Sequence, residues 1–214
     1  MIKPRHIFFI MIPAIFLVAG IFMIRIWQYN SLSQSRKIQS QQNESLDLIP
    51  ILPDDPIIGS PSSPKTIVVF EDLACAGCKI QDTFLKQVQQ QHPGKVKIIW
   101  KGLPVIPYPY PSEVAHEYAF CAHKQGKFEV FKEYAFVNNT NLTPTTLVTI
   151  SNEIELDQEK LSACLDSNDG LAYIDTIQSL ATILHVQSVP TFFVDNTQIA
   201  TPNSVAEWEI VLGL

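Results

Sequence analysis

The sequence predicts an α/β domain whose sheet is interrupted by a helical insertion and which follows one N-terminal transmembrane helix. Three observations support this prediction. Short apolar runs typical of buried strands lie near both ends of residues 56–214. Between them, at about 112–170, apolar residues recur at helical spacing. A long apolar run lies near the N-terminus. We therefore divide the chain into an anchor at 1–27, a tether at 28–55 and a folded domain at 56–214.

The N-terminal apolar run is long enough to cross a membrane. Residues 7–24 are 18 uncharged positions, and at about 1.5 Å per residue they span roughly 27 Å, close to the thickness of a hydrocarbon core. A cleaved signal peptide is the alternative, but its apolar region is about 7–15 residues long and ends at small residues. We expect an uncleaved signal anchor. Lys3 and Arg5 precede the run and Arg25 follows it, so charge does not decide its orientation.

Residues 28–55 predict a tether that is flexible at first and then rich in proline. Its polar start, QYNSLSQSRKIQSQQNES, has too few apolar side chains to fold. Pro50 and Pro53, with Pro56 at the domain boundary, stiffen the approach to the domain.

A β-α-β unit opens the domain. Thr66–Phe70 is an apolar, β-branched run that predicts a buried strand. Lys79–Gln91 carries apolar residues at helical spacing and ends before Pro93-Gly94, and Val96–Lys101 predicts a second strand. A unit of this size implies a parallel strand pair with a right-handed crossover.

A helical block and a closing β-β-α unit complete the domain. Four prolines in GLPVIPYPYPS separate the first unit from the block. Thr191–Asp195 and Gln198–Ala200 then predict a hairpin, and Asn203 is expected to cap a last helix at Ser204–Leu212. The block itself contains five predicted helices, at Ser112–Lys124, Phe128–Val137, Thr145–Ile154, Gln158–Asp166 and Leu171–Leu184.

Composition limits the function classes. The chain has 15 basic and 21 acidic residues and a net charge of −6, which disfavours a general nucleic-acid binder. Four cysteines are too few for a disulfide-rich scaffold but could form two pairs. His116 and His123 share a helix face, but two histidines are not a metal site, and we expect surface or hydrogen-bonded side chains. No cofactor or metal is predicted.

The sequence Cys75-Ala76-Gly77-Cys78 lies where the first strand ends and the first helix begins. The unpaired N–H groups of a helix start stabilise an anion, so they lower the pKa of a thiol at Cys75. Cys78, one turn further, can attack a mixed disulfide formed at Cys75. The motif therefore predicts a two-electron thiol–disulfide switch.

Other interpretations of the motif are weaker. A structural zinc site needs four ligands, and Cys121 and Cys164, which could complete it, are single and widely separated. A redox-inert disulfide, or two cysteines buried by chance, fits the strand-to-helix position less well. A rival from another class is a metallochaperone that carries Cu(I) on the two thiols.

These residues, with Val189-Pro190 directly before the predicted strand TFFVD, resemble the thioredoxin superfamily. The closer resemblance is to its DsbA-like branch, the extracytoplasmic dithiol oxidoreductases with a helical insertion. The resemblance spans about residues 56–214 and implies a thioredoxin fold. Besides the Cys-x-x-Cys motif, the matching segments are FCAHKQGKF, LSACLDS and VPTFFVD.

The resemblance implies a role for each matching residue. Cys75 would be the nucleophile and Cys78 the resolving, more buried thiol. Pro190 would be a cis-proline that faces them. Val189 would offer its backbone groups to a bound substrate strand.

The resemblance also suggests that Cys121 and Cys164 form a second, non-catalytic disulfide. Such a bond would close a loop of 44 residues and stabilise the domain by roughly 4 kcal/mol. Two buried thiols are the alternative. Because a structural disulfide needs an oxidising compartment, we expect the domain outside the cytoplasm, in the periplasm or at the surface of a bacterium.

The sequence also departs from the strongly oxidising members of this branch. Its dipeptide is Ala76-Gly77 instead of Pro-His, and without that histidine Cys75 should be less acidic and the disulfide less oxidising. Lys79 could compensate as a nearby cation, although a solvated lysine is the simpler interpretation. Asp72 could assist proton transfer or could serve as a turn residue.

We expect a membrane-tethered oxidoreductase that transfers the Cys75–Cys78 disulfide to cysteine-containing secreted or surface proteins. By family analogy, a quinone-linked membrane partner would reoxidise it. The main alternative is the reverse direction, a reductase or isomerase kept reduced by a membrane electron donor. The two directions differ in redox potential. A non-catalytic binding module that uses the groove near Pro190 would instead bind partners without Cys75.

Overall fold

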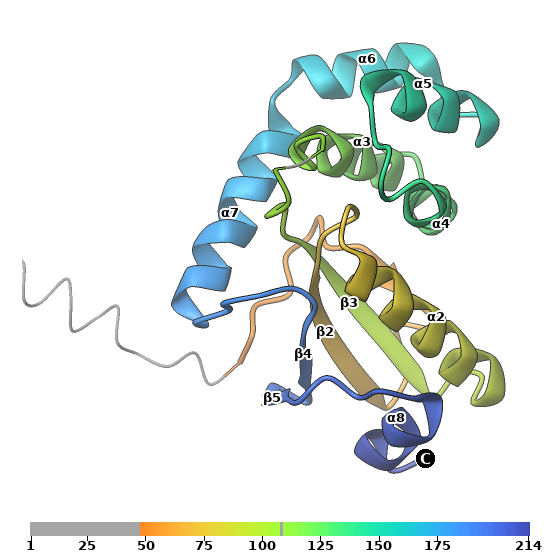
Figure 1. The fold of residues 1–214 in the computed structure, drawn as a ribbon, viewed down its shortest axis with the longest axis vertical. Helices are drawn as coiled ribbons and strands as arrows, with labels where there is room; N and C mark the ends of the chain where they lie inside the picture. Colours follow the sequence, from red (N-terminus) through yellow and green to blue (C-terminus); the bar gives the residue numbers. More distant parts are fainter. Residues whose placement is uncertain (1–47, 108) are drawn as a thin grey trace, which may run out of the picture. The chain divides into compact units, whose positions relative to one another are not determined.

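The computed structural model describes residues 48–107 and 109–214. The anchor predicted at 1–27 and the tether up to residue 47 lie outside the described residues. Within the described ranges, no helix is both long enough and apolar enough to span a membrane. The helices and strands labelled in Figure 1 are β1 (Ile57–Ile58), β2 (Lys65–Glu71), α2 (Ala76–Gln91), β3 (Val96–Gly102), α3 (Glu113–Lys124), α4 (Phe128–Val137), α5 (Pro144–Glu153), α6 (Gln158–Asp166), α7 (Asp169–Ile183), β4 (Thr191–Val194), β5 (Thr197–Ile199) and α8 (Val205–Leu212).

The strands form one five-stranded sheet in the order β1-β3-β2-β4-β5. Only β2 and β3 run parallel; β1, β4 and β5 join their neighbours antiparallel. The predicted order β-α-β, helical block, β-β-α is therefore confirmed. The central strand β2 is buried on both faces, from Ile67 at 0% exposure to Phe70 at 0%, which explains why its sequence is a continuous apolar run instead of an alternating one.

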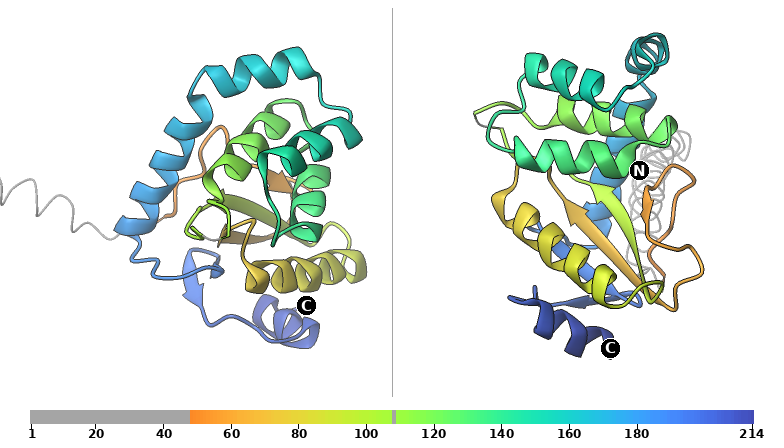
Figure 2. Two further views of the ribbon diagram at one scale, coloured as in Figure 1. Left: turned by 45° about the horizontal axis from the view of Figure 1, so that its top comes forward. Right: turned by 90° about the vertical axis from the view of Figure 1, so that its right-hand side faces the viewer.

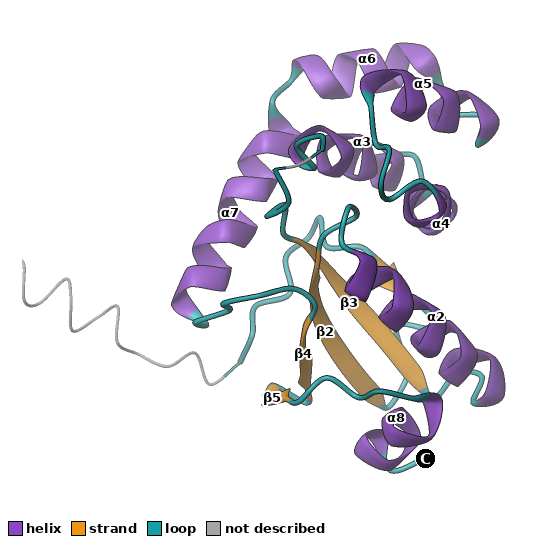
Figure 3. Ribbon diagram, viewed as in Figure 1, coloured by secondary structure: helices purple, strands orange, loops and turns teal. Residues whose placement is uncertain are grey.

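Helices cover one face of the sheet and one of its ends. α2 packs along one face with α8 beside it, while the segment 48–56 lies on the opposite face (Figure 2). Helices α3 to α6 gather beyond the carboxyl ends of β2 and β3 (Figure 3). The turn from β2 into α2 also lies at this end. The insertion is therefore placed to contact the start of α2.

Helix starts follow local capping rules, with one correction to the prediction. The prediction that Asn203 caps α8 is wrong, because the N-cap is Ser204, whose hydroxyl accepts the Glu207 N–H at 3.2 Å. Glu207 in turn accepts the Asn203 N–H at 2.8 Å. The serine and glutamate thus satisfy two N–H groups at the helix start, and Asn203 contributes only its backbone.

The segment before β2 is more firmly attached than the tether prediction indicates. Ile49 is buried, and its N–H donates to the Asn196 side chain at 3.0 Å. Asp55 forms a buried ion pair with Lys101 and accepts the Tyr173 hydroxyl at 2.7 Å. Within the described residues, the chain already packs against the domain at Ile49. The strand β1 that follows has only two residues, too short for hydrophobic periodicity to predict.

Candidate active site

The cysteines of the Cys-x-x-Cys motif lie at the amino-terminal end of α2. Cys75 is the N-cap residue: its backbone is extended, with φ −85° and ψ 120°, and its Sγ accepts the Cys78 N–H at 3.2 Å. Both cysteines are free thiols, Cys75 half-buried and Cys78 fully buried. Only Cys75 is therefore open to a second molecule.

The two thiols have opposite acidities. The hydrogen bond from the Cys78 side chain acts most strongly on Cys75; together with the backbone N–H groups of Gly77 and Cys78 it outweighs burial and lowers the pKa of Cys75 to about 7. Burial, above all, raises the pKa of Cys78 far above its ordinary value. At neutral pH the thiolate therefore forms on Cys75, the accessible sulfur, and not on Cys78, so Cys75 is the nucleophile.

The segment before β4 faces Cys75. The Val189–Pro190 peptide bond is cis, and the carbonyl oxygen of Val189 lies 3.8 Å from Cys75 Sγ. The proline ring lies close to the start of α2. A Cβ at Gly77 would lie 3.5 Å from Pro190 Cδ and 3.8 Å from Cys75 Sγ. The structure thus brings Cys75, Cys78, Val189 and Pro190 into one site.

Asp72, three residues before Cys75, is a buried turn residue. Its Oδ1 accepts the Ala74 N–H at 2.9 Å, and its Oδ2 accepts the N–H groups of Val105 at 2.7 Å and Ile106 at 2.8 Å. Burial favours the neutral acid, but the neighbouring His116 side chain and, after it, the backbone N–H groups of Ala74 and Val105 outweigh burial and hold the pKa of Asp72 below its ordinary value. The carboxylate therefore fixes the proline-rich segment beside the cysteines, and its oxygens are occupied by donors.

A buried ion cluster lies behind Cys78. Glu71, the last residue of β2, accepts hydrogen bonds from Lys132 Nζ at 2.8 Å and from Trp100 Nε1 at 3.0 Å. Lys132 also meets Asp82, one helical turn after Cys78, at 3.0 Å. Burial raises the pKa of Glu71, and Lys132 partly offsets the effect. After burial and the neighbouring thiol, the charge of Glu71 is the next cause of the raised pKa of Cys78.

Sequence reasoning missed both Glu71 and Lys132. A signal for Lys132 exists: it follows Phe128 by four residues and precedes Ala135 by three, so it lies on the apolar face of α4. A lysine on such a face needs a buried carboxylate. The sequence contains 21 acidic residues. No local rule identifies Glu71 as the partner of Lys132, because Glu71 lies 61 positions earlier.

The remaining candidates have structural environments. His116 is buried and accepts the Leu73 N–H at 3.2 Å, so the expectation of a hydrogen-bonded side chain is confirmed for it. Lys79 is partly exposed and forms no ion pair with any described residue. Among residues 48–107 and 109–214, no group of three or more histidine, cysteine or acidic side chains is arranged to hold a metal ion.

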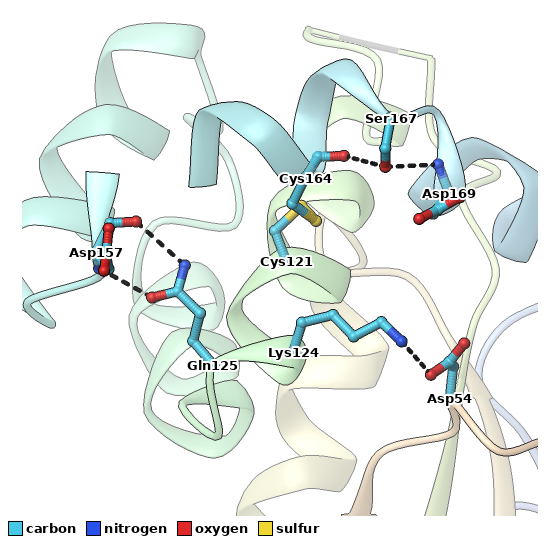
Figure 4. The surroundings of a disulfide bond; sticks show 8 residues. All are labelled: Asp54, Cys121, Lys124, Gln125, Asp157, Cys164, Ser167 and Asp169. Atoms are coloured by element: carbon cyan, nitrogen blue, oxygen red, sulfur yellow. Dashed lines mark hydrogen bonds and ion pairs between the residues drawn. A yellow bond between two sulfur atoms is a disulfide. The ribbon is translucent and has the colours of Figure 1, made fainter. Parts of the chain in front are cut away.

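The second cysteine pair ties two helices of the insertion together. Cys121 of α3 and Cys164 of α6 form a disulfide with Cα atoms 5.8 Å apart. Beside it, the Gln125 side chain accepts the Asp157 N–H at 2.9 Å (Figure 4). Neither sulfur is at a helix start, because Cys121 lies in the last third of α3 and Cys164 near the end of α6. No helix N-terminus therefore activates this pair.

The fold and the Cys-x-x-Cys pair at the start of α2 are those of a known family. A family model described as thioredoxin, Thioredoxin_4, matches residues 52–212. The chain belongs to this family.

Solved structures show the same fold. α-DsbA2 of Wolbachia pipientis, a thiol-disulfide exchange protein, is 18% identical with a TM-score of 0.67, over 87% of this chain and 97% of that one. A periplasmic thioredoxin-like protein of Salmonella enterica is 22% identical with a TM-score of 0.65, over 77% and 91%. BdbD of Bacillus subtilis, in its oxidised form, is 19% identical with a TM-score of 0.63, over 75% and 91%.

Curated relatives are similar over a shorter part of their length. The Na(+)/H(+) antiporter NhaA 3 of Salinispora tropica is 25% identical over 160 residues, which cover 74% of this chain and 24% of the antiporter. NhaA 1 of Salinispora arenicola is 26% identical over 150 residues, or 69% and 23%. The chain thus spans about a quarter of the length of the curated relatives it matches.

Proposed function

We propose that the protein is an extracytoplasmic disulfide donor, in which oxidised Cys75–Cys78 transfers its bond to cysteine-containing secreted or surface proteins. The observation that supports this most directly is the asymmetry of the pair: an exposed thiol with a pKa of about 7 and a buried thiol with a raised pKa. A membrane partner, quinone-linked by family analogy, would then reoxidise the pair.

The transfer consists of two exchanges. A substrate thiolate attacks Cys75 Sγ of the oxidised pair, the Cys75–Cys78 bond breaks, and Cys78 leaves and takes up a proton. A second substrate thiolate then attacks the substrate sulfur of the mixed disulfide, and Cys75 leaves as a thiolate. The substrate loses two electrons and two protons to form its disulfide; the enzyme pair gains the two electrons, Cys78 takes up one proton and the other goes to solvent. The helix-start N–H groups of Gly77 and Cys78 stabilise Cys75 as the leaving group.

The substrate strand is expected beside Val189. Its carbonyl oxygen faces Cys75 Sγ at 3.8 Å, so a substrate cysteine that reaches Cys75 comes within range of this backbone. Val189 and Pro190 are both partly exposed. We infer that an extended substrate segment pairs with the Val189 backbone while its sulfur reacts.

Reduction of substrates is the second candidate function. The observation that favours it is the value of about 7 for the pKa of Cys75, which is similar to thioredoxin, at about 7, and well above the most oxidising family members, at about 3.5. A less acidic thiol gives a less oxidising disulfide. In this direction a membrane electron donor would keep the pair reduced.

The proposed compartment rests on the second disulfide and on the predicted anchor. The Cys121–Cys164 bond is of the kind that persists in oxidising compartments. With the apolar run at 7–24 as an anchor at 1–27, the disulfide would then place the domain on the outer side of a bacterial membrane, facing the periplasm or the cell surface. The periplasmic relative from Salmonella enterica supports the same location.

The test is a redox titration of the purified full-length protein against glutathione, followed by oxidation of a reduced, unfolded substrate. A donor should equilibrate at a potential less negative than about −270 mV, the value of thioredoxin, and should introduce disulfides. A potential at or below that value would favour the reductase. A protein that forms no Cys75–Cys78 disulfide, or that binds Cu(I) stoichiometrically without exchange, would refute both directions.

A further inference from the structure

The turn between β2 and α2, which positions Cys75 at the start of α2, depends on a hydrogen-bond acceptor from helix α3 of the insertion. Within the turn, Cys75 N–H donates to Asp72 O at 3.0 Å and Ala74 N–H donates to Asp72 Oδ1 at 2.9 Å. Leu73, which lies between Asp72 and Ala74 in the chain, is fully buried. The acceptor of its N–H is His116 Nε2 of α3, at 3.2 Å, and no other described residue accepts this N–H.

The His116 ring is held in a fixed orientation. It is 2% exposed and stacks on Trp100 of β3, with ring centroids 5.3 Å apart and 17° between planes. Gly102 leaves the space that this stack needs, because a Cβ there would lie 2.5 Å from His116 Nδ1 and 2.4 Å from the Trp100 ring. The ring therefore cannot turn away from Leu73 without moving β3.

The position of the imidazole proton follows from the neighbours of Nε2. This nitrogen lies 3.2 Å from Leu73 N and 3.4 Å from Asp72 Oδ1. It cannot serve both groups, since it accepts with a lone pair or donates with a proton. Asp72 Oδ1 already accepts the Ala74 N–H, whereas Leu73 N–H has only His116. Giving Leu73 N–H its acceptor places the lone pair on Nε2 and the proton on Nδ1, a buried nitrogen that has no hydrogen-bond partner among the described residues.

We propose that His116 is a positioning residue of the active site, which by accepting the Leu73 N–H fixes the backbone that places Cys75 Sγ at the start of α2. The inference rests on the proposed function only in taking Cys75 as the reacting thiol. A buried N–H without an acceptor is costly, so loss of His116 Nε2 drives this backbone to rotate toward water. Cys75 Sγ then leaves the Cys78 N–H, which is now at 3.2 Å.

A matched pair of substitutions separates the hydrogen bond from the packing. His116→Gln and His116→Asn both replace the ring by a neutral amide and both lose the stack on Trp100. Only the longer glutamine carries its carbonyl oxygen as far as the Nε2 position. Leu147→Ala serves as a stability control, because Leu147 is fully buried in α5 and contributes no group to the turn.

The experiment measures the pH dependence of Cys75 alkylation in the full-length reduced protein. His116→Asn should raise the midpoint by about half to one pH unit, the equivalent of one lost hydrogen bond. His116→Gln and Leu147→Ala should keep the wild-type midpoint. Equal midpoints in the two amide variants, raised or not, would overturn the proposal, because the acceptor would then not matter. A raised midpoint in Leu147→Ala would overturn it as well, since the readout would follow stability alone.

A second measurement needs no variant. Nitrogen-15 NMR of the wild-type protein reports which imidazole nitrogen carries the proton. The proposal requires a lone pair on His116 Nε2; a ring protonated on Nε2 would overturn it. Disulfide donation by the wild-type protein is assayed in parallel. Failure of that assay would refute the proposed function. The two His116 tests would still give a result, because neither of them measures disulfide donation.

Discussion

Two cysteine pairs in the same domain have opposite environments. Cys75 caps α2, is half-buried and has a pKa lowered to about 7 by the Cys78 thiol and helix-start N–H groups. Cys121 and Cys164 lie within helices of the insertion and are joined in a disulfide. The residue type is the same in both pairs. The difference shows that position relative to a helix start, together with exposure, decides which pair is reactive.

Substitution of either cysteine of the Cys75–Cys78 pair should have the largest effect, and that effect is on disulfide exchange. Cys75→Ser should abolish exchange, because Cys75 is the accessible sulfur. Cys78→Ser should leave Cys75 able to attack but unable to resolve, so mixed disulfides with substrates should accumulate. Non-reducing electrophoresis and mass spectrometry of the trapped species check this. Trapping through any other cysteine would refute the assignment.

The buried ion cluster behind Cys78 should have the largest effect on stability. Lys132 is 3% exposed and bridges Glu71 and Asp82, so Lys132→Met leaves buried carboxylates without their cation. We expect a loss of about 3–5 kcal/mol in the free energy of unfolding. Lys124→Met is the control, since Lys124 pairs with Asp54 at the surface, and it should cost at most about 1 kcal/mol. Urea unfolding of both variants makes the comparison, and equal losses would contradict it.

Removing the second disulfide should lower stability and spare exchange. The double substitution of Cys121 and Cys164 by serine opens the link between α3 and α6. The expected loss approaches but does not reach roughly 4 kcal/mol, because denatured chains retain structure. Melting temperature and disulfide transfer at moderate temperature are measured together. Loss of transfer in a variant that is still folded would show that this pair takes part in turnover.

The smallest predicted effect is a pH dependence of stability in the reduced protein. The pKa of Cys75 falls from an ordinary value of 9.0 to about 7 on folding, so the folded thiolate forms before the unfolded one does. The contribution of Cys75 to the free energy of unfolding should therefore rise between pH 7 and 9 and be absent below pH 7. Because Cys75 is half-exposed, solvent screening limits the gain to about 1–2 kcal/mol. Cys75→Ala should remove this slope, and a slope that persists would assign it to another group.

Much of the fold was predictable because local patterns determine it. The helix at Phe128–Val137 has the predicted bounds, since its apolar residues recur every three or four positions. The start of α2 was predicted three residues late, at Lys79 instead of Ala76. The small residues Ala76 and Gly77 give no periodic signal there. The cysteine motif was recognisable because its chemistry requires a fixed spacing.

The rest of the site depends on contacts between distant parts of the chain. Asp72 could be a proton carrier or a turn residue on sequence grounds, and only its contacts with Val105 and Ile106 distinguish the two. The partner of Leu73 N–H is His116, 43 positions away. Such pairings follow from how α3 packs beyond the carboxyl ends of β2 and β3, and no local rule contains that information.

The most direct test of the account follows both cysteine pairs in one titration. The full-length protein is equilibrated with glutathione over a range of potentials and quenched, and each pair is quantified by mass spectrometry. The account predicts that Cys75–Cys78 titrates reversibly at a potential less negative than about −270 mV, while Cys121–Cys164 stays oxidised across that range. Reduction of both pairs together, or a Cys75–Cys78 pair that never forms a disulfide, would contradict it.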